Sequence, residues 1–231
     1  MRDIKIAPSI LAANPARLAD ETEKVEKAGA PWLHLDIMDG HFVPNLSYSA
    51  DLVKALRPLS NMFFDVHLMI TDPEKYMGAF IDAGADMITF HYEALESETK
   101  IRDLADKIHK SGVKAGISIK PKTPIEEVEG VLDAFDMILI MTVEPGFGGQ
   151  SYMADMNSKI RRAAQLADSK FCGLDVEVDG GISAKTIHMA AENGANIFVA
   201  GSAVFGAEDV PAAVVELRKI AEEASVGYYE G

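Results

Sequence analysis

Three apolar segments of the chain, residues 32–39, 63–69 and 175–181, carry ionisable side chains at alternate positions. Side chains alternate between the two faces of a β-strand, so in each segment the ionisable residues share one face. Burying a carboxylate or an imidazole without a partner is costly, so such groups are normally paired or bound to a metal ion. The pattern therefore predicts one polar site built from buried strands. The residues on these faces are His34, Asp36 and Met38, then Asp65, His67 and Met69, and then Asp175, Glu177 and Asp179.

Strand-like apolar segments alternate with amphipathic helical segments along the whole chain. This alternation is typical of a parallel sheet whose strands are connected by helices. The first strand runs into Pro8 rather than into a glycine-rich turn, which favours a closed barrel over an open doubly wound sheet. We therefore expect an α/β protein in which residues 1–231 form a single (β/α)₈ TIM barrel, as one catalytic domain.

The same pattern predicts the individual elements. Prolines near the starts of several helical segments fit the first turn of a helix, where a missing N–H costs little. Residues 225–231 are expected to be loose surface chain. The expected strands are 5–10, 32–37, 63–69, 87–92, 113–119, 137–143, 175–179 and 197–201, and helices are expected at 15–28, 73–83, 98–110, 124–134, 153–167 and 210–224.

Composition limits the class of partner. The formal net charge of −14 argues against nucleic acid and against an anionic membrane surface. No apolar run approaches the ~20 residues that span a bilayer, and the first residues lack a signal-peptide pattern, so we expect a soluble cytoplasmic protein. The single cysteine, Cys172, excludes an internal disulfide framework, and we interpret it as a small apolar residue.

Four of the ionisable residues lie at the carboxyl ends of their strands: His34, Asp36, His67 and Asp179. In a barrel these ends meet at one rim, where catalytic groups are found. Imidazole and carboxylate ligands together suit a divalent cation such as Zn²⁺, Fe²⁺, Mn²⁺ or Co²⁺, and the ligands alone do not choose among these. The set predicts one metal site.

The remaining histidines are interpreted differently. His41 falls in a loop, and His109 and His188 fall on helices, so we expect structural roles for these three. His91 points inward on the fourth strand, where we expect a structural or supporting role.

Two carboxylates beside one metal ion suggest acid–base chemistry on a carbon acid. One Asp would remove a proton from one side of the carbon, and the other would return it from the opposite side. A metal ion would stabilise the resulting enediolate as a Lewis acid. When two carboxylates share a site, one of them is expected to hold its proton more readily than usual.

Glycine-bearing turns follow the sixth, seventh and eighth expected strands. Glycine lets backbone N–H groups approach an anion closely, and loops at this position often bind phosphate in barrels. Three such turns at one rim predict a phosphate site, beside which inward methionines would line the pocket or fill the core. The turns contain Gly146, Phe147, Gly148 and Gly149, then Gly180 and Gly181, and then Gly201 and Ser202; the methionines are Met38, Met69 and Met141.

Longer motifs make the chain resemble the ribulose-phosphate 3-epimerase family over essentially its whole length. Two of them are long and distinctive, residues 34–45 (HLDIMDGHFVPN) and 141–150 (MTVEPGFGGQ). Shorter matches are residues 7–11, 65–69 and 178–182.

The resemblance implies a metal-dependent isomerase that interconverts D-ribulose 5-phosphate and D-xylulose 5-phosphate. It implies that His34, Asp36, His67 and Asp179 hold one divalent cation, with Zn²⁺ as the first candidate. Asp36 and Asp179 would be the acid–base pair. Ser9 and His67 would contact the sugar, the three glycine turns would hold the phosphate, the loop 40–45 would border the site, and the protein would be a homo-oligomer.

Three segments depart from the usual family pattern. Residues 47–50 replace an expected Gly-Pro pair, Lys120 stands where Asn is common, and residues 151–154 replace a more apolar stretch. These departures lie at or beside the barrel mouth and touch none of the expected ligands, so they bear on substrate length rather than on the chemistry.

Other functions remain open at this point. A 3-epimerase of a longer ketose phosphate, such as D-allulose 6-phosphate, would use the same ligands. A lyase on a related barrel, such as a hexulose-phosphate synthase, would cleave a carbon–carbon bond, but two His and two Asp argue against it. A non-catalytic sugar-phosphate sensor would need no opposed carboxylates.

Overall fold

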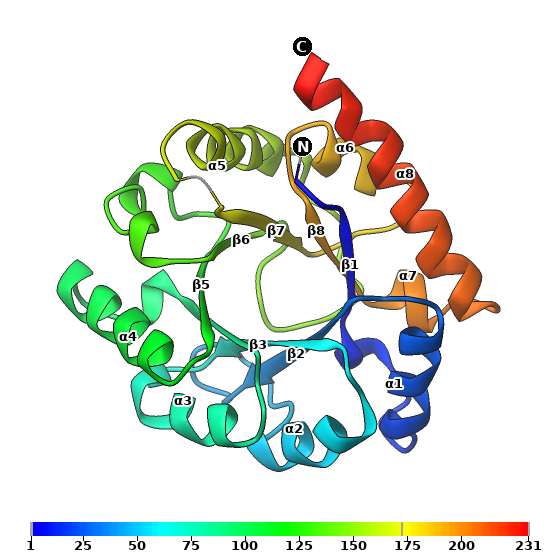
Figure 1. Cartoon of the computed structure of the whole chain (residues 1–231), viewed down its shortest axis with the longest axis horizontal. Coiled ribbons are helices and arrows are strands. Elements are labelled where there is room, and N and C mark those ends of the chain that lie inside the picture. Colours follow the sequence, from blue (N-terminus) through cyan, green and yellow to red (C-terminus); the bar gives the residue numbers. More distant parts are fainter. Residues whose placement is uncertain (1, 172, 231) are drawn as a thin grey trace.

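The strands form one parallel sheet that curves into a barrel. The computed structural model describes residues 2–171 and 173–230. Strands that are consecutive in the chain are neighbours in the sheet, and Figure 1 shows them as a ring with the helices outside it. The strands are β1 (Lys5–Pro8), β2 (Trp32–Met38), β3 (Phe63–Met69), β4 (Met87–His91), β5 (Lys114–Ile119), β6 (Met137–Met141), β7 (Asp175–Asp179) and β8 (Ile197–Ala200).

The ring closes between its first and second strands. β1 pairs with β8 along its length, and a parallel bridge joins Ser9 to His34 just beyond the end of β1. This bridge completes the circle, because every other neighbouring pair of strands is connected by ladder hydrogen bonds. The expected (β/α)₈ architecture is confirmed.

Helices cover the outside of the barrel and return the chain to the start of the next strand. Side-chain caps begin two of them: Asp72 accepts a hydrogen bond from the Lys75 backbone N–H, and Ser97 accepts one from Lys100. The helices are α1 (Leu18–Lys27), α2 (Ala50–Leu56), α3 (Pro73–Asp82), α4 (Glu98–Lys110), α5 (Asn157–Ser169), α6 (Ile187–Ala191), α7 (Ser202–Phe205) and α8 (Val210–Glu230).

The α-helix expected at 124–134 is wrong. This segment forms two 3₁₀ turns, Ile125–Glu127 and Leu132–Ala134. Its buried residues Ile125, Val128 and Val131 are three positions apart, and each of the last two donates its N–H to the carbonyl of the one before. A spacing of three places side chains on one face of a 3₁₀ turn, so burial selects this geometry.

The prediction of a loose tail is also wrong over the described residues. α8 continues to Glu230, and two tyrosines near its end make tertiary contacts. The Tyr228 hydroxyl donates to Asp168 at 2.8 Å, and the Tyr229 hydroxyl accepts from the Arg2 backbone N–H at 3.0 Å. These contacts hold the two ends of the chain near each other (Figure 1). The prediction for Cys172 lies outside the described residues.

The two faces of each strand have different environments. Outward residues such as Leu33, Leu35 and Val176 are fully buried in the large apolar core between the barrel and the helices. Inside the barrel, a smaller apolar cluster that includes Trp32 and Met87 fills one level of the interior. The alternating polar residues occupy other levels of the same interior, and they form the site described next.

Candidate active site

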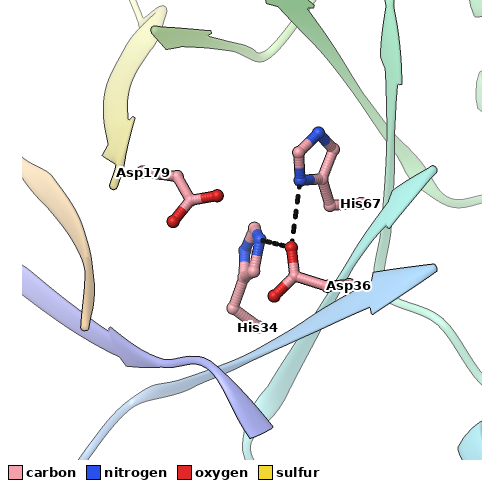
Figure 2. A group of neighbouring side chains, drawn as sticks. All are labelled: His34, Asp36, His67 and Asp179. Atoms are coloured by element: carbon pink, nitrogen blue, oxygen red, sulfur yellow. Dashed lines mark ion pairs between the residues drawn. The ribbon is translucent and has the colours of Figure 1, made fainter. Parts of the chain in front are cut away.

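The register of β2 and β3 brings two predicted ligands together. Asp36 is paired with His67, and His34, two residues earlier, is paired with Asp65. Since residues two apart share a face, these four side chains point into the barrel. Asp179, the last residue of β7, enters from across the barrel and points toward the others in Figure 2.

The four predicted ligands form one compact group. One ligand atom from each of His34, Asp36, His67 and Asp179 lies within 4.8 Å of the others. Asp36 Oδ1 lies 3.3 Å from His34 Nε2 and 3.4 Å from His67 Nδ1, the contacts dashed in Figure 2. The other oxygen of Asp36 accepts a 2.6 Å hydrogen bond from the Ser9 hydroxyl.

Two buried nitrogen atoms of this group fit a metal ion. His34 Nε2 and His67 Nδ1 have no hydrogen-bond partner within the described part of the chain, although both side chains are fully buried. An orphaned polar atom in the interior is normally costly, and a cation accepts its lone pair. Two bare imidazole nitrogens facing two carboxylates therefore fit a divalent cation of the first transition series or zinc.

A second layer of ionisable residues lies behind His34. The Nδ1 atom of His34 is 2.7 Å from Asp65 Oδ2, and Asp65 also accepts a 2.8 Å hydrogen bond from the Thr89 hydroxyl. Glu177 is fully buried nearby, 3.8 Å from the same nitrogen, and burial together with the Asp65 charge raises its pKa well above the usual range. Asp65 therefore orients His34 so that Nε2 faces the cation position.

The two carboxylates at the cation position have pKa values displaced in opposite directions. Burial raises the pKa of Asp179 to about 7, and the nearby Asp36 charge adds to the increase. Burial also acts to raise the pKa of Asp36, but the His34 charge and the close approach of the His34 and His67 rings hold it well below its usual range. These directions belong to the cation-free site, because a bound cation favours ionised carboxylates and neutral imidazoles.

A pocket opens above these ligands at the carboxyl ends of the strands. It is lined by Asp36, Asp179 and most of the other residues predicted for the site, whereas His34 and His67 lie buried beneath it. The predicted lining residues that the structure brings together here are Ser9, Met38, Met69, Met141, Gly146, Phe147, Gly148, Gly149, Gly180, Gly181, Gly201 and Ser202.

The loop after β6 is braced by side chains that the glycine pattern alone did not identify. Gly146 has a φ of +126°, and its carbonyl accepts a 2.8 Å hydrogen bond from the Asn45 side chain. The Gln150 amide donates to the carbonyls of Glu144 and Phe147 at 2.7 and 2.9 Å. Phe147 at the tip stays 54% exposed. The expected border loop 40–45 therefore contacts this loop directly.

Among the four histidines outside the ligand group, His91 differs from His41, His109 and His188. His41 and His109 are surface residues, bound to the Asp39 carbonyl and to the Asp136 carboxylate respectively, and His188 lies on the short helix α6. None of these three is part of the ligand group. His91 is fully buried, and its Nε2 lies 2.9 Å from His67 Nε2.

The fold and the pocket together define an enzyme built on a (β/α)₈ barrel. A profile of the ribulose-phosphate 3 epimerase family matches residues 5–205. A ribulose-phosphate 3-epimerase from Mycobacterium bovis is 48% identical over 221 residues, which cover 96% of this chain and 94% of that protein. One from Bacillus subtilis is 45% identical over 216 residues, covering 93% and 98%. The chain belongs to the ribulose-phosphate 3-epimerase family and is an epimerase, an enzyme of the isomerase class.

More distant solved structures share the fold. A 3-hexulose-6-phosphate synthase from Salmonella typhimurium is 15% identical, with a TM-score of 0.69 over 96% of this chain and 100% of that one. A 3-keto-L-gulonate-6-phosphate decarboxylase from Vibrio cholerae is also 15% identical, with a TM-score of 0.65 over 96% and 99%. At this level of identity the likeness shows the barrel and not the reaction.

Proposed function

We propose that the protein interconverts D-ribulose 5-phosphate and D-xylulose 5-phosphate by moving a proton at C3. The relatives from Mycobacterium bovis and Bacillus subtilis carry the name of this reaction, which supports the choice of a pentulose phosphate. The observation that carries the proposal is the pair Asp36 and Asp179, two carboxylates from the different strands β2 and β7 that line one pocket and belong to one ligand group. Inversion at carbon needs one proton acceptor and one proton donor.

The two carboxylates divide the proton transfer between them. One of Asp36 and Asp179 takes the C3 proton from one side, and the other delivers a proton to the opposite side of C3. The roles exchange in the reverse direction. General acid–base catalysis of this kind contributes about 10²–10⁴-fold to the rate.

One divalent cation is proposed at His34, Asp36, His67 and Asp179, with Zn²⁺ as the first candidate and Fe²⁺, Mn²⁺ or Co²⁺ as alternatives. When bound, it supplies Lewis-acid stabilisation of the negative charge that develops on the substrate oxygens. Ser9 holds Asp36 in place through its 2.6 Å hydrogen bond and is also proposed, with His67, to contact the sugar. The methionines at the pocket wall exclude water from the reacting carbon.

The phosphate of the substrate is proposed to bind where the three glycine turns meet. Gly146–Gly149, Gly180–Gly181 and Gly201–Ser202 all line the same pocket, and their backbone N–H groups offer donors to an anion. Among the residues that line this pocket, none is a lysine or an arginine, so backbone donors are the main source of phosphate affinity in this proposal.

Location and self-association are further parts of the proposal. Over the described residues, no helix combines the length and the apolar character needed to cross a membrane. A relative from Oryza sativa is named a cytoplasmic isoform, which supports a cytoplasmic location for this protein. Homo-oligomerisation is proposed from the family resemblance, and its test is the mass of the purified protein in solution.

The decisive experiment follows the C3 hydrogen. Ribulose 5-phosphate labelled with deuterium at C3 is incubated with the protein and followed by NMR, with and without a chelator. We expect loss of the label to solvent together with formation of xylulose 5-phosphate, and loss of both activities when the metal is removed. Epimerisation that retains the label would refute the two-base scheme. A higher kcat/KM for D-allulose 6-phosphate than for ribulose 5-phosphate in parallel assays would assign the six-carbon sugar phosphate as the substrate instead.

A further inference from the structure

The second imidazole of the ligand group, His67, has two nitrogens in different surroundings. Nδ1 faces Asp36 Oδ1 at 3.4 Å and has no hydrogen-bond partner among the described residues. Nε2 lies 2.9 Å from Nε2 of His91, a second fully buried ring. In a contact between two neutral imidazole nitrogens, one nitrogen must carry a hydrogen and the other must accept it.

The carboxylate of Glu93, on the other side of His91, sets the direction of this hydrogen bond. The other nitrogen of His91, Nδ1, lies 3.2 Å from Glu93 Oε2. Glu93 behaves as an acceptor throughout, since its other oxygen takes hydrogen bonds from the Lys120 backbone N–H at 2.8 Å and from the Thr123 hydroxyl. His91 Nδ1 must therefore carry a hydrogen, which leaves His91 Nε2 bare in the neutral ring.

The bare nitrogen of His91 in turn fixes the hydrogen on His67. His91 Nε2 accepts, so His67 Nε2 donates, and His67 Nδ1 keeps its lone pair toward the cation position. The opposite tautomer of His67 would place a hydrogen on Nδ1 and leave two bare nitrogens 2.9 Å apart. That arrangement would lose both the metal ligand and the hydrogen bond.

Packing holds the rings of His67 and His91 in place. The His67 and His91 rings meet edge to edge, with centroids 4.9 Å apart and ring planes inclined by 28°, and the Phe42 ring centroid lies 4.8 Å from that of His91. Lys120 lies over the Phe42 ring at 3.7 Å. Glu93 belongs to the short turn Tyr92–Ala94 that directly follows β4, so His91 and its acceptor are positioned by the same stretch of backbone.

We infer that His91 and Glu93 are positioning residues for the metal site, which fix the tautomer and the orientation of His67. The inference rests on the proposed cation site. His34 is oriented differently, because Asp65 accepts directly from its Nδ1 at 2.7 Å, whereas the carboxylate behind His67 acts through an intervening ring. The two histidine ligands therefore present opposite ring nitrogens, Nε2 of His34 and Nδ1 of His67, to the same position.

The first test needs no variant. Nitrogen-15 NMR of the histidine rings in wild-type protein at pH 8 should show His67 with its hydrogen on Nε2 and a bare Nδ1, and His91 with its hydrogen on Nδ1. The His67 assignment can be made by comparison with a His67→Gln variant. A hydrogen on His67 Nδ1 would overturn the inference.

The second test measures cation affinity by competition with a coloured chelator, using Zn²⁺ and Co²⁺ alone. His91→Phe keeps a ring against Phe42 but removes the acceptor, and we expect affinity to fall about 10–100-fold. His91→Gln restores an acceptor and should recover most of that loss. Glu93→Ala, which leaves both rings in place, should weaken affinity and shift the ring-nitrogen signals of His91.

His109→Gln is the matched control, since it removes another histidine–carboxylate contact, the exposed one with Asp136, which is not part of the ligand group. It should leave cation affinity unchanged. If wild-type protein binds neither cation, the proposed metal site itself fails. If wild-type protein binds them and the folded His91→Phe and Glu93→Ala variants bind equally tightly, the metal site stands and the positioning role is refuted.

Discussion

The Ser9 hydroxyl donates a 2.6 Å hydrogen bond to Asp36 Oδ2 at the seam where the barrel closes. The same seam contains the bridge between Ser9 and His34. One residue therefore joins the first strand to the second through its backbone and orients Asp36 through its side chain, leaving Asp36 Oδ1 for the two imidazoles. We therefore expect stability and catalysis to be coupled at this position.

Replacing Ser9 with alanine should weaken both properties. A buried hydrogen bond to a charged group is worth about 1.5–3 kcal/mol, so Ser9→Ala should lower the free energy of unfolding by roughly that amount, together with kcat. Urea denaturation and turnover on ribulose 5-phosphate measure the two effects. Ser158→Ala is the control, because the Ser158 hydroxyl makes only an exposed 3.3 Å contact with the Asp155 carbonyl. A stable but slow Ser9→Ala variant would separate the two roles.

Removing either proposed acid–base group should abolish epimerisation. Asp36→Asn and Asp179→Asn keep the size of the side chain but remove its ability to exchange a proton, so kcat should fall by at least ~10²–10⁴-fold. Circular dichroism should report an intact barrel. Asp106→Asn, an exposed residue of α4 paired with Lys110, should keep full activity. Rates near the wild-type value for either site variant would contradict the two-base scheme.

The raised pKa of Asp179 predicts how the metal-free protein responds to pH. Its pKa is about 7 in the fold and near the ordinary 3.8 when unfolded, so the folded state binds more protons between these values. Stability from this group is therefore present at low pH and is lost as pH rises from about 4 to about 7.

Asp179→Asn removes the ionised group and should stabilise the metal-free protein at pH 8 but not at pH 5. The side chain is partly exposed to the pocket, so solvent screening reduces the effect to about 1 kcal/mol, or ~2–4 °C in Tm. Thermal unfolding in the presence of chelator measures it. An equal change at both pH values would contradict the assigned shift.

Two glycines of the phosphate turns should respond differently to alanine. Gly180 has a φ of +126°, and an added Cβ would lie 2.8 Å from the Val143 backbone nitrogen, so Gly180→Ala should destabilise the fold. Gly148 has no atom within 4 Å of such a Cβ. Gly148→Ala should therefore keep its unfolding free energy but hinder approach of the anion.

The measurement for this pair is KM together with inhibition by inorganic phosphate. Gly148→Ala should raise KM and weaken phosphate inhibition while leaving urea denaturation unchanged. Gly29→Ala is a comparison for the free energy of unfolding alone. Gly29 also has open space around it, but its φ of +79° makes an alanine there strained. Unchanged phosphate inhibition in Gly148→Ala would remove that turn from the proposed phosphate site.

Local chemistry made much of the fold and of the ligand group predictable from sequence. The alternation of polar and apolar residues in 32–38, 63–69 and 175–179 specifies which side chains point inward, because the period of a strand is two. Parallel strands end at the same rim, so His34, Asp36, His67 and Asp179 could be expected to meet before any distance was known. Glycine turns at that rim predicted the lining of the pocket for the same reason.

Tertiary structure decided the features that depend on pairing across the barrel. The register between neighbouring strands places Asp65 beside His34 and His91 beside His67. Spacing within one strand specifies neither of these two contacts. Tertiary packing also decided that residues 124–134 form 3₁₀ turns, because burial outweighs local helix propensity. The last helix continues through Tyr228 because that residue forms a long-range hydrogen bond with Asp168. The sequence by itself determined which groups face the barrel axis; only closure of the ring decided which of them touch, since contact needs the register that all eight strands set together.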